Sequence, residues 1–152
     1  MVWLKLLGRK LTTLKQLSFQ DRWLLMGAFV GLIFVAIALP RLGLKMTQNI
    51  LIKLPQIRCK VSDSEREKRV SQTAAMVKIA TRYCQSFSNC LKQSLVLWEL
   101  LYLQRIESEL RIGVRRDRGE FEAHAWVEYQ GIALNEIRDV REDFATFDRI
   151  IC

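Results

Sequence analysis

Hydrophobic and polar positions near the start of the chain follow a helical period. Over residues 1 to 22, leucines recur at helical spacing between lysines and arginines, which predicts a basic amphipathic helix or two short ones. Residues 23 to 39 then form a run of 17 residues without a charge, between Arg22 and Pro40. Because a bilayer core needs about 20 apolar residues, with a lower limit of about 17, this run has the length of a short membrane-spanning helix or of a buried one.

Three interpretations of the apolar run stay open at the level of sequence. A signal peptide is the least favoured, because its apolar core is usually shorter, although Ala36 and Ala38 resemble a cleavage site. A transmembrane anchor agrees with the G-x-x-x-G motif of Gly27 and Gly31, which lets helices approach closely in lipid. A helical hairpin, packed on the domain or lying in the membrane interface, is the third. Both flanks are basic, so they do not decide an orientation.

A basic connector is expected over residues 40 to 61, and a second group of helical patterns follows it. Ser62 and Ser64 are each followed three residues later by a glutamate, the capping-box pattern of a helix start. We therefore expect a helix from this point to about Tyr83. Its inner face is predicted to carry Val70, Ala74, Val77 and Ala80.

A second helix is expected over residues 90 to 106, with Ser88 or Asn89 as its cap. After Ser108 the period changes to the alternation of half-buried strands. The predicted strands cover residues 109–115, 121–129 and 132–134, residues 116–120 form a polar loop, and residues 139–148 form a charged helix or loop with Phe144 and Phe147 turned inward.

Helices followed by antiparallel strands predict an α+β fold. We expect this domain over residues 61 to 152. Residues 1 to 60 form a basic, apolar helical segment with its connector, as a membrane anchor or a packed hairpin.

The net charge changes this picture when it is divided along the chain. Residues 1 to 60 contain 10 lysines and arginines and a single acid, Asp21, a balance of +9, whereas residues 61 to 152 contain 14 basic and 15 acidic residues, a balance of −1. A nucleic-acid-binding domain would carry its positive charge on the folded unit, so no nucleic-acid partner is expected. The basic segment instead fits an anionic membrane surface or an acidic partner.

The cysteines indicate free thiols rather than a metal site or a disulfide scaffold. The four of them form no C-x-x-C pair, and the chain has one histidine, so we expect neither a metal nor another cofactor. Four cysteines are also few for a disulfide-rich protein of this length, which favours a reducing compartment. They are Cys59, Cys84, Cys90 and Cys152.

Cys90 and His124 are the candidate catalytic pair. Cys90 lies at the expected first turn of a helix, where unpaired amides and the helix dipole favour the thiolate, which is the nucleophilic form. Cys84, at the end of the preceding helix, lacks this advantage. His124 lies on a predicted strand, which can present a base rigidly. A cysteine at a helix start followed by a histidine on a strand is the order of papain-like and transglutaminase-like enzymes.

A family resemblance rests on three motifs between Cys90 and Gly131. Residues 121 to 128 read F-E-A-H-A-W-V-E, the preceding strand contains I-G-V at residues 112 to 114, and the helix start reads C-L-K-Q-S-L at residues 90 to 95. Together they resemble the lasso-peptide biosynthesis B2 proteins over about residues 62 to 150.

The resemblance implies a transglutaminase-like core and the activity of a cysteine peptidase that removes the leader of a ribosomally made lasso precursor peptide. It implies three partners: the precursor, a separate small leader-recognition protein, and the macrolactam cyclase that acts on the freed core. We expect a cytoplasmic bacterial protein, with residues 23 to 39 as the segment that would hold it at the inner face of the membrane.

The resemblance also assigns roles to residues. Cys90 would be the nucleophile and His124 the general base and acid. The family has an aspartate where this chain has Glu136, and a carboxylate displaced by about 1 Å can lower a rate by about 100-fold. Asn135 and Asp139 are the next candidates to orient the imidazole, in that order. A membrane-associated interaction protein with little turnover and an acyltransferase that uses the same Cys–His pair are the alternative functions.

Overall fold

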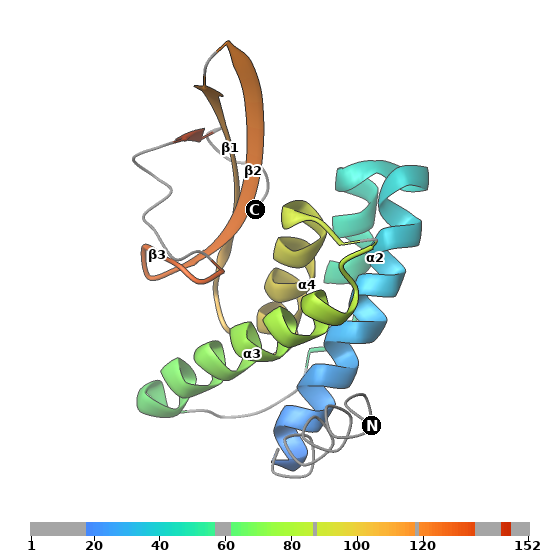
Figure 1. Ribbon diagram of the computed structural model, residues 1–152. Coiled ribbons are helices and arrows are strands. Elements are labelled where there is room, and N and C mark those ends of the chain that lie inside the picture. The colour runs from blue at the N-terminus through green and yellow to red at the C-terminus, as the bar shows by residue number, and fades with distance from the viewer. Residues whose placement is uncertain (1–17, 57–61, 87, 118, 136–143, 147–152) are drawn as a thin grey trace, which may run out of the picture.

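A computed structural model describes the protein over residues 18–56, 62–86, 88–117, 119–135 and 144–146. In these ranges three helices come first: α2 (Phe19–Ile52), α3 (Asp63–Tyr83) and α4 (Cys90–Leu103). A four-stranded antiparallel sheet follows, in the spatial order β3-β2-β1-β4. Figure 1 shows α4 between α2 on one side and the sheet on the other. The predicted α+β fold is confirmed.

Helix α2 has two arms. It begins with a capping box in which the Ser18 hydroxyl accepts from the Asp21 amide at 3.2 Å, while Asp21 accepts from the Ser18 amide. At Gly43 φ is +73°, a value that glycine adopts without a steric penalty, and the helix changes direction there (Figure 1). The second arm continues to Ile52, so the connector expected over residues 40 to 61 is helical through much of its length.

The first arm of α2 packs against the rest of the molecule through small residues. A Cβ atom on Gly27 would lie 3.2 Å from Cδ2 of Leu100, and one on Gly31 would lie 3.1 Å from Cγ1 of Val96. The G-x-x-x-G motif is therefore the surface on which α4 approaches α2.

Among the described residues, one helix, α2, is long and apolar enough to cross a membrane by length and composition. A third of its most apolar window is buried. The buried part forms one core with α3 and α4 and contains Leu25, Ala28, Leu32, Val35 and Leu51.

The two helix starts expected in the domain differ in their caps. Ser62 is the N-cap of α3, but its side chain makes no capping hydrogen bond, so the capping box predicted there does not form. Asn89 caps α4, and its Oδ1 accepts from the backbone amide of Lys92 at 3.0 Å. Of the two residues expected to cap this helix, Ser88 and Asn89, the cap is Asn89. Cys90 is therefore the first residue of α4.

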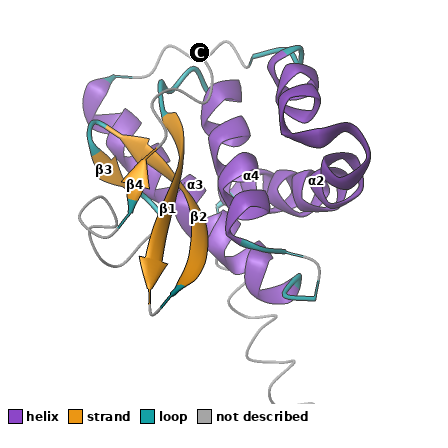
Figure 2. Ribbon diagram, turned by 90° about the horizontal axis from the view of Figure 1, so that it is seen from above, coloured by secondary structure: helices purple, strands orange, loops and turns teal. Residues whose placement is uncertain are grey.

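The sheet is built on a long hairpin of β1 (Glu109–Asp117) and β2 (Glu120–Tyr129). These strands extend further than expected, to Asp117 and from Glu120, into the polar loop predicted over residues 116 to 120. Gly119, before β2, has φ +92°. Strand β3 (Ile132–Ala133) lies where a strand was predicted. Strand β4 (Ala145–Thr146) pairs with β1 at the other edge, in a segment expected to be a helix or loop. Figure 2 shows this sheet beside α3 and α4.

Candidate active site

Cys90 begins α4 and is partly exposed. The first turn of a helix has backbone N–H groups without intrahelical acceptors, and these groups and the helix dipole favour an anion at this position. The Asn89 side chain satisfies the Lys92 amide. The amide of Cys90 itself belongs to this turn, and it is a candidate donor for the oxyanion that forms when a thiolate attacks a carbonyl.

Cys84, six residues earlier, lies in an environment that disfavours the thiolate. It follows the last turn of α3, and its side chain is 6% exposed. Burial raises the pKa of the Cys84 thiol, because the thiolate loses its solvation there. Both thiols are free. Their positions on the two helices agree with the sequence-based choice of Cys90 over Cys84, although burial, more than the helix end, disfavours the Cys84 thiolate.

Ser94 joins the helix of Cys90 to the strand of His124. It lies one helical turn after Cys90 on the same side of α4, and its hydroxyl donates to the backbone carbonyl of Ala125 at 2.9 Å. Ser94 is fully buried. Because Ala125 directly follows His124, this bond ties α4 to β2 close to both candidate catalytic residues.

Asn135 completes this connection from beyond β3. Its Nδ2 donates to Ser94 Oγ at 3.0 Å, and its Oδ1 accepts from the backbone amide of Val127 at 2.9 Å. We call Ser94 and Asn135, with the main-chain groups of Ala125 and Val127, the α4–β2 clamp. Both ends of the Asn135 amide are therefore engaged in holding helix and strand together.

The imidazole of His124 lies against two aromatic rings. Its centroid is 6.2 Å from the Trp126 ring, stacked at 22°, and 5.5 Å from the Phe144 ring, tilted at 34°. Trp126 is fully buried, and its indole N–H donates to Glu128 Oε1 at 2.9 Å. The two rings restrict the orientation of the imidazole, and a fixed orientation is what a general base requires. Phe144 faces inward as the sequence predicts.

Gly113 makes room for these rings. It pairs with His124 across the β1–β2 ladder. A Cβ atom at this position would lie 2.9 Å from Cβ of Phe144 and 2.9 Å from Cη2 of Trp126, closer than side chains tolerate. The glycine of the I-G-V motif is thus required by the packing beside the histidine.

Of the three candidates for the residue that orients His124, the structure describes one. Glu136, the first candidate to orient His124, and Asp139, the third, lie outside the described residues. Asn135, the second candidate, is part of the α4–β2 clamp. The assignment of the orienting residue to Glu136 stays a prediction.

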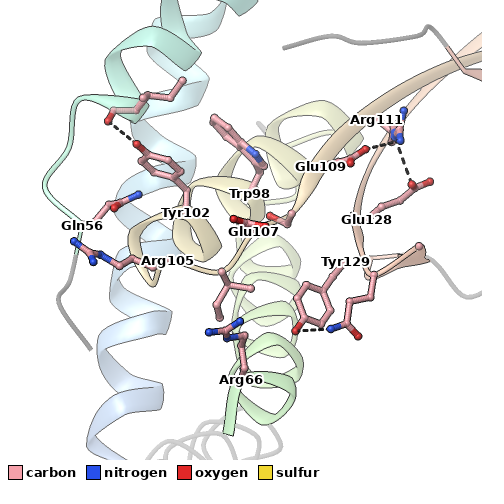
Figure 3. Close-up of a pocket in the computed structure, with 15 residues that line it drawn as sticks. Gln56, Arg66, Trp98, Tyr102, Arg105, Glu107, Glu109, Arg111, Glu128 and Tyr129 are labelled. Atoms are coloured by element: carbon pink, nitrogen blue, oxygen red, sulfur yellow. Dashed lines mark hydrogen bonds and ion pairs between the residues drawn. The ribbon is translucent and has the colours of Figure 1, made fainter. Parts of the chain in front are cut away.

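A large cavity lies at the other end of α4 from Cys90. It has a volume of about 1140 Å³ and is formed by the ends of α2 and α4, the start of α3 and the β2–β3 turn. Figure 3 shows Arg66, Tyr102 and Tyr129 around it, with Arg111 paired to Glu128 at 3.4 Å. Neither Cys90 nor His124 lines this cavity. A much smaller one of about 120 Å³ touches the clamp at Asn135.

Two residues of the site have no functional signature of their own in the sequence. Ser94 lies within the C-L-K-Q-S-L motif, and Gly113 lies within the I-G-V strand. The spacing of Ser94, four residues after the cysteine, carries a signal, because a polar residue on the inner side of an apolar helix needs a hydrogen-bond partner when buried.

Comparisons with known proteins agree with this arrangement. The family model described as "Transglutaminase-like superfamily" matches residues 34 to 148, which include the second arm of α2. Searches of the curated proteins and of the solved structures found no match. The match covers most of the chain and both candidate catalytic residues. The chain belongs to the transglutaminase-like superfamily.

Proposed function

We propose that the protein is a cysteine peptidase that removes the leader from a ribosomally made lasso precursor peptide. The observation that supports the proposal is the α4–β2 clamp, which bonds Ser94, one helical turn after Cys90, to the strand that carries His124. The superfamily is consistent with cysteine hydrolase or acyl-transfer chemistry. The lasso precursor as substrate rests on the resemblance of the H-A-W-V-E and C-L-K-Q-S-L motifs.

The reaction has two steps. The Cys90 thiolate attacks the carbonyl carbon of the scissile peptide bond, and the amide of the helix start donates to the resulting oxyanion. The C–N bond then breaks, protonated His124 gives its proton to the leaving amine, and the leader stays as a thioester on Cys90. Water, deprotonated by His124, hydrolyses the thioester and restores the thiol. The freed amine is the amino terminus of the core peptide.

The proposal is tested by cleavage of the precursor. Purified full-length protein, precursor and the small leader-recognition protein are combined, and the products are identified by mass spectrometry. We expect cleavage between leader and core, loss of at least about 10³-fold in rate for Cys90→Ala, and a rate close to that of the unsubstituted protein for Cys84→Ala. Undiminished cleavage by Cys90→Ala would overturn the assignment.

The same experiment distinguishes the two alternative functions, because each gives a different product. If an amine in place of water accepts the acyl group, the leader appears joined to that amine, which identifies an acyltransferase. If the folded protein binds the precursor and cleaves nothing, the function is that of an interaction protein. Glu136→Asp tests the third position separately, because it restores the side-chain length that the family uses; a faster rate than that of the Glu136 protein is expected if Glu136 orients His124.

A further inference from the structure

The first arm of α2 is apolar on two opposite faces. One face is buried on α3 and α4, through residues such as Ala28, Leu32 and Val35. On the opposite face, six large apolar side chains are between 36% and 63% exposed. We call them the outer stripe: Trp23, Met26, Val30, Ile33, Phe34 and Ile37.

The spacing of the outer stripe aligns its side chains. At about 100° per residue, these positions fall within a sector of about 100° on the helix, directly opposite the buried face. Soluble proteins seldom expose a continuous apolar surface of this kind, and one that is bordered by charges is typical of an interaction site. The stripe therefore needs a partner that is both extended and apolar.

The charges around the stripe identify the class of partner. Arg22 and Arg41 stand at its two ends, Lys45 follows on the second arm, and all three are exposed. The only acid in the first 60 residues is Asp21, in the capping box with Ser18. An apolar stripe bordered by cations matches an anionic lipid surface, where the side chains enter the acyl region and the cations meet the headgroups.

The packing of α2 decides how it would lie on the bilayer. Gly27 and Gly31, in the middle of the apolar run, contact Leu100 and Val96 of α4. The carboxylate of Glu99 is within contact distance of the same position, 3.4 Å from a Cβ on Gly31. If α2 crossed the membrane with this packing, α4 and its acid would be carried into the bilayer core, at high cost. A helix that lies along the surface keeps α4 in water.

We propose that the outer stripe of α2 binds an anionic lipid bilayer with the helix parallel to the membrane plane, so that the enzyme is a peripheral protein of the membrane surface. Trp23, at the start of the stripe, is suited to the interface because its ring is apolar and its N–H is polar. The proposal does not depend on the reaction, since lipid binding and cleavage are measured separately.

Flotation with vesicles tests the proposal. Full-length protein is mixed with vesicles of phosphatidylcholine alone or with phosphatidylglycerol added. We expect binding to the anionic vesicles that weakens at about 1 M salt, where the screening length falls to about 3 Å. Arg41→Gln and Lys45→Gln should each weaken it about fivefold. Equal binding to both vesicles, unaffected by salt, would overturn the role of the charges.

A matched pair of substitutions tests the stripe itself. Val30 is 63% exposed within it, and Ile132, on β3, is 66% exposed outside it. Val30→Asp should weaken vesicle binding at least about tenfold, and Ile132→Asp should leave it unchanged, with both proteins equally folded by circular dichroism. Equal loss or no loss in the two variants would overturn the proposal. So would a lipid-free dimer that Val30→Asp dissociates, because the stripe would then bind a second copy of the chain.

The depth of position 30 separates a surface helix from a spanning one. In Val30→Trp, quenching by brominated lipids, measured relative to the unsubstituted protein, should be strongest for bromines near the headgroups, about 5–10 Å into the boundary region. Strongest quenching at the bilayer centre would mean that α2 spans the membrane and would overturn the parallel orientation.

Discussion

Helix α4 meets β2 on one side and α2 on the other, and the two contacts use different interactions. Toward β2, the buried Ser94 hydroxyl and the Asn135 amide form directional hydrogen bonds of 2.9 to 3.0 Å. Toward α2, Val96 and Leu100 pack onto two glycines of its first arm. A single longer hydrogen bond among the described residues, from the Tyr102 hydroxyl to the Ile52 carbonyl at 3.3 Å, lies at the far end of α4 from Cys90. Hydrogen bonds define angles and distances, whereas apolar packing mainly contributes free energy of folding.

The difference indicates a division of roles between the two sides of α4. The side with hydrogen bonds faces the strand of His124 one turn after Cys90, so small displacements there are expected to alter the proposed chemistry. The side that packs on α2 connects the domain to the helix proposed to lie on lipid. Changes on the first side should lower the reaction rate more than the stability, and changes on the second side should do the reverse.

The largest expected effect is on the β2 side, at His124. His124→Gln keeps a polar side chain of similar size but removes the proposed general base, so the cleavage rate should fall at least about 10³-fold. The midpoint of thermal unfolding should change little, because the imidazole is only partly buried. Single-turnover cleavage and calorimetry measure the two quantities. A variant that keeps its rate would contradict the catalytic role of His124.

Glu99, on the side of α4 that packs on α2, is expected to make the free energy of unfolding depend on pH. Burial raises the pKa of this carboxyl from 4.5 to about 7. Between these values the folded protein keeps a proton that the unfolded chain releases. The contribution of Glu99 to stability is therefore largest below about pH 4.5 and falls by up to about 3 kcal/mol as the pH rises to about 7. Urea unfolding across this range measures it.

The control for this effect is a solvent-exposed glutamate. Glu99→Gln should flatten the dependence of the unfolding free energy on pH, because an amide does not titrate. Glu107→Gln, at an exposed position shortly after α4, should leave the dependence as it is. If both variants behave like the unsubstituted protein, Glu99 is ionised in the fold at neutral pH.

Gly31→Val should break the packing on the α2 side. Its Cβ would approach Val96 to 3.1 Å, and the added methyl groups would separate α2 from α4. A loss of about 2 kcal/mol in unfolding free energy is expected, as is usual for an overfilled contact. Met26→Val, which places the same side chain on the exposed face of the same helix, should change stability by less than about 0.5 kcal/mol. Similar losses in the two variants would show that the contact with Val96 is not responsible.

Asn135→Ala should open the clamp on the β2 side. The Val127 amide would lose its acceptor and Ser94 its donor, at a cost of about 1–2 kcal/mol. A fall of about tenfold in the cleavage rate should accompany it if, as we propose, the clamp keeps the Cys90 helix and the His124 strand in a fixed relative position. Asn135→Asp, which keeps the acceptor for Val127, should lose less stability. A rate equal to that of the unsubstituted protein would mean that the clamp does not position the pair.

Much of the fold is predictable from local patterns. Helices α3 and α4 and the strands β1 to β3 follow from periodicity, because each has one buried face whose period shows in the sequence. Strand β4 does not, since Ala145 and Thr146 form only two residues of an edge, set by pairing with β1 and not by their own pattern. The cap at Ser62 was also predicted wrongly, because its hydroxyl does not turn toward the helix amides.

The candidate catalytic residues are predictable from the sequence, whereas the residues that pack and bond around them are less so. Cys90 and His124 can be chosen from sequence, because a nucleophile and a base are distinctive residue types. Ser94, Asn135 and Gly113 act through contacts between segments distant in sequence, the first two across 41 residues. Such contacts depend on how α4 meets β2, and that relation appears only in three dimensions.

The clamp also closes the edge of the sheet. From Ala125 to Val127, the outer edge of β2 binds side chains and the amide of Leu134, in place of a neighbouring strand among the described residues. A carboxamide carries a carbonyl acceptor and N–H donors, as a peptide unit carries a carbonyl and an N–H, so Asn135 can substitute for a missing strand. An open edge is a template on which another chain can add. The residue that aligns helix and strand thus also protects the sheet from joining a second sheet, and Asn135→Ala should associate more readily on warming than its loss of stability alone explains.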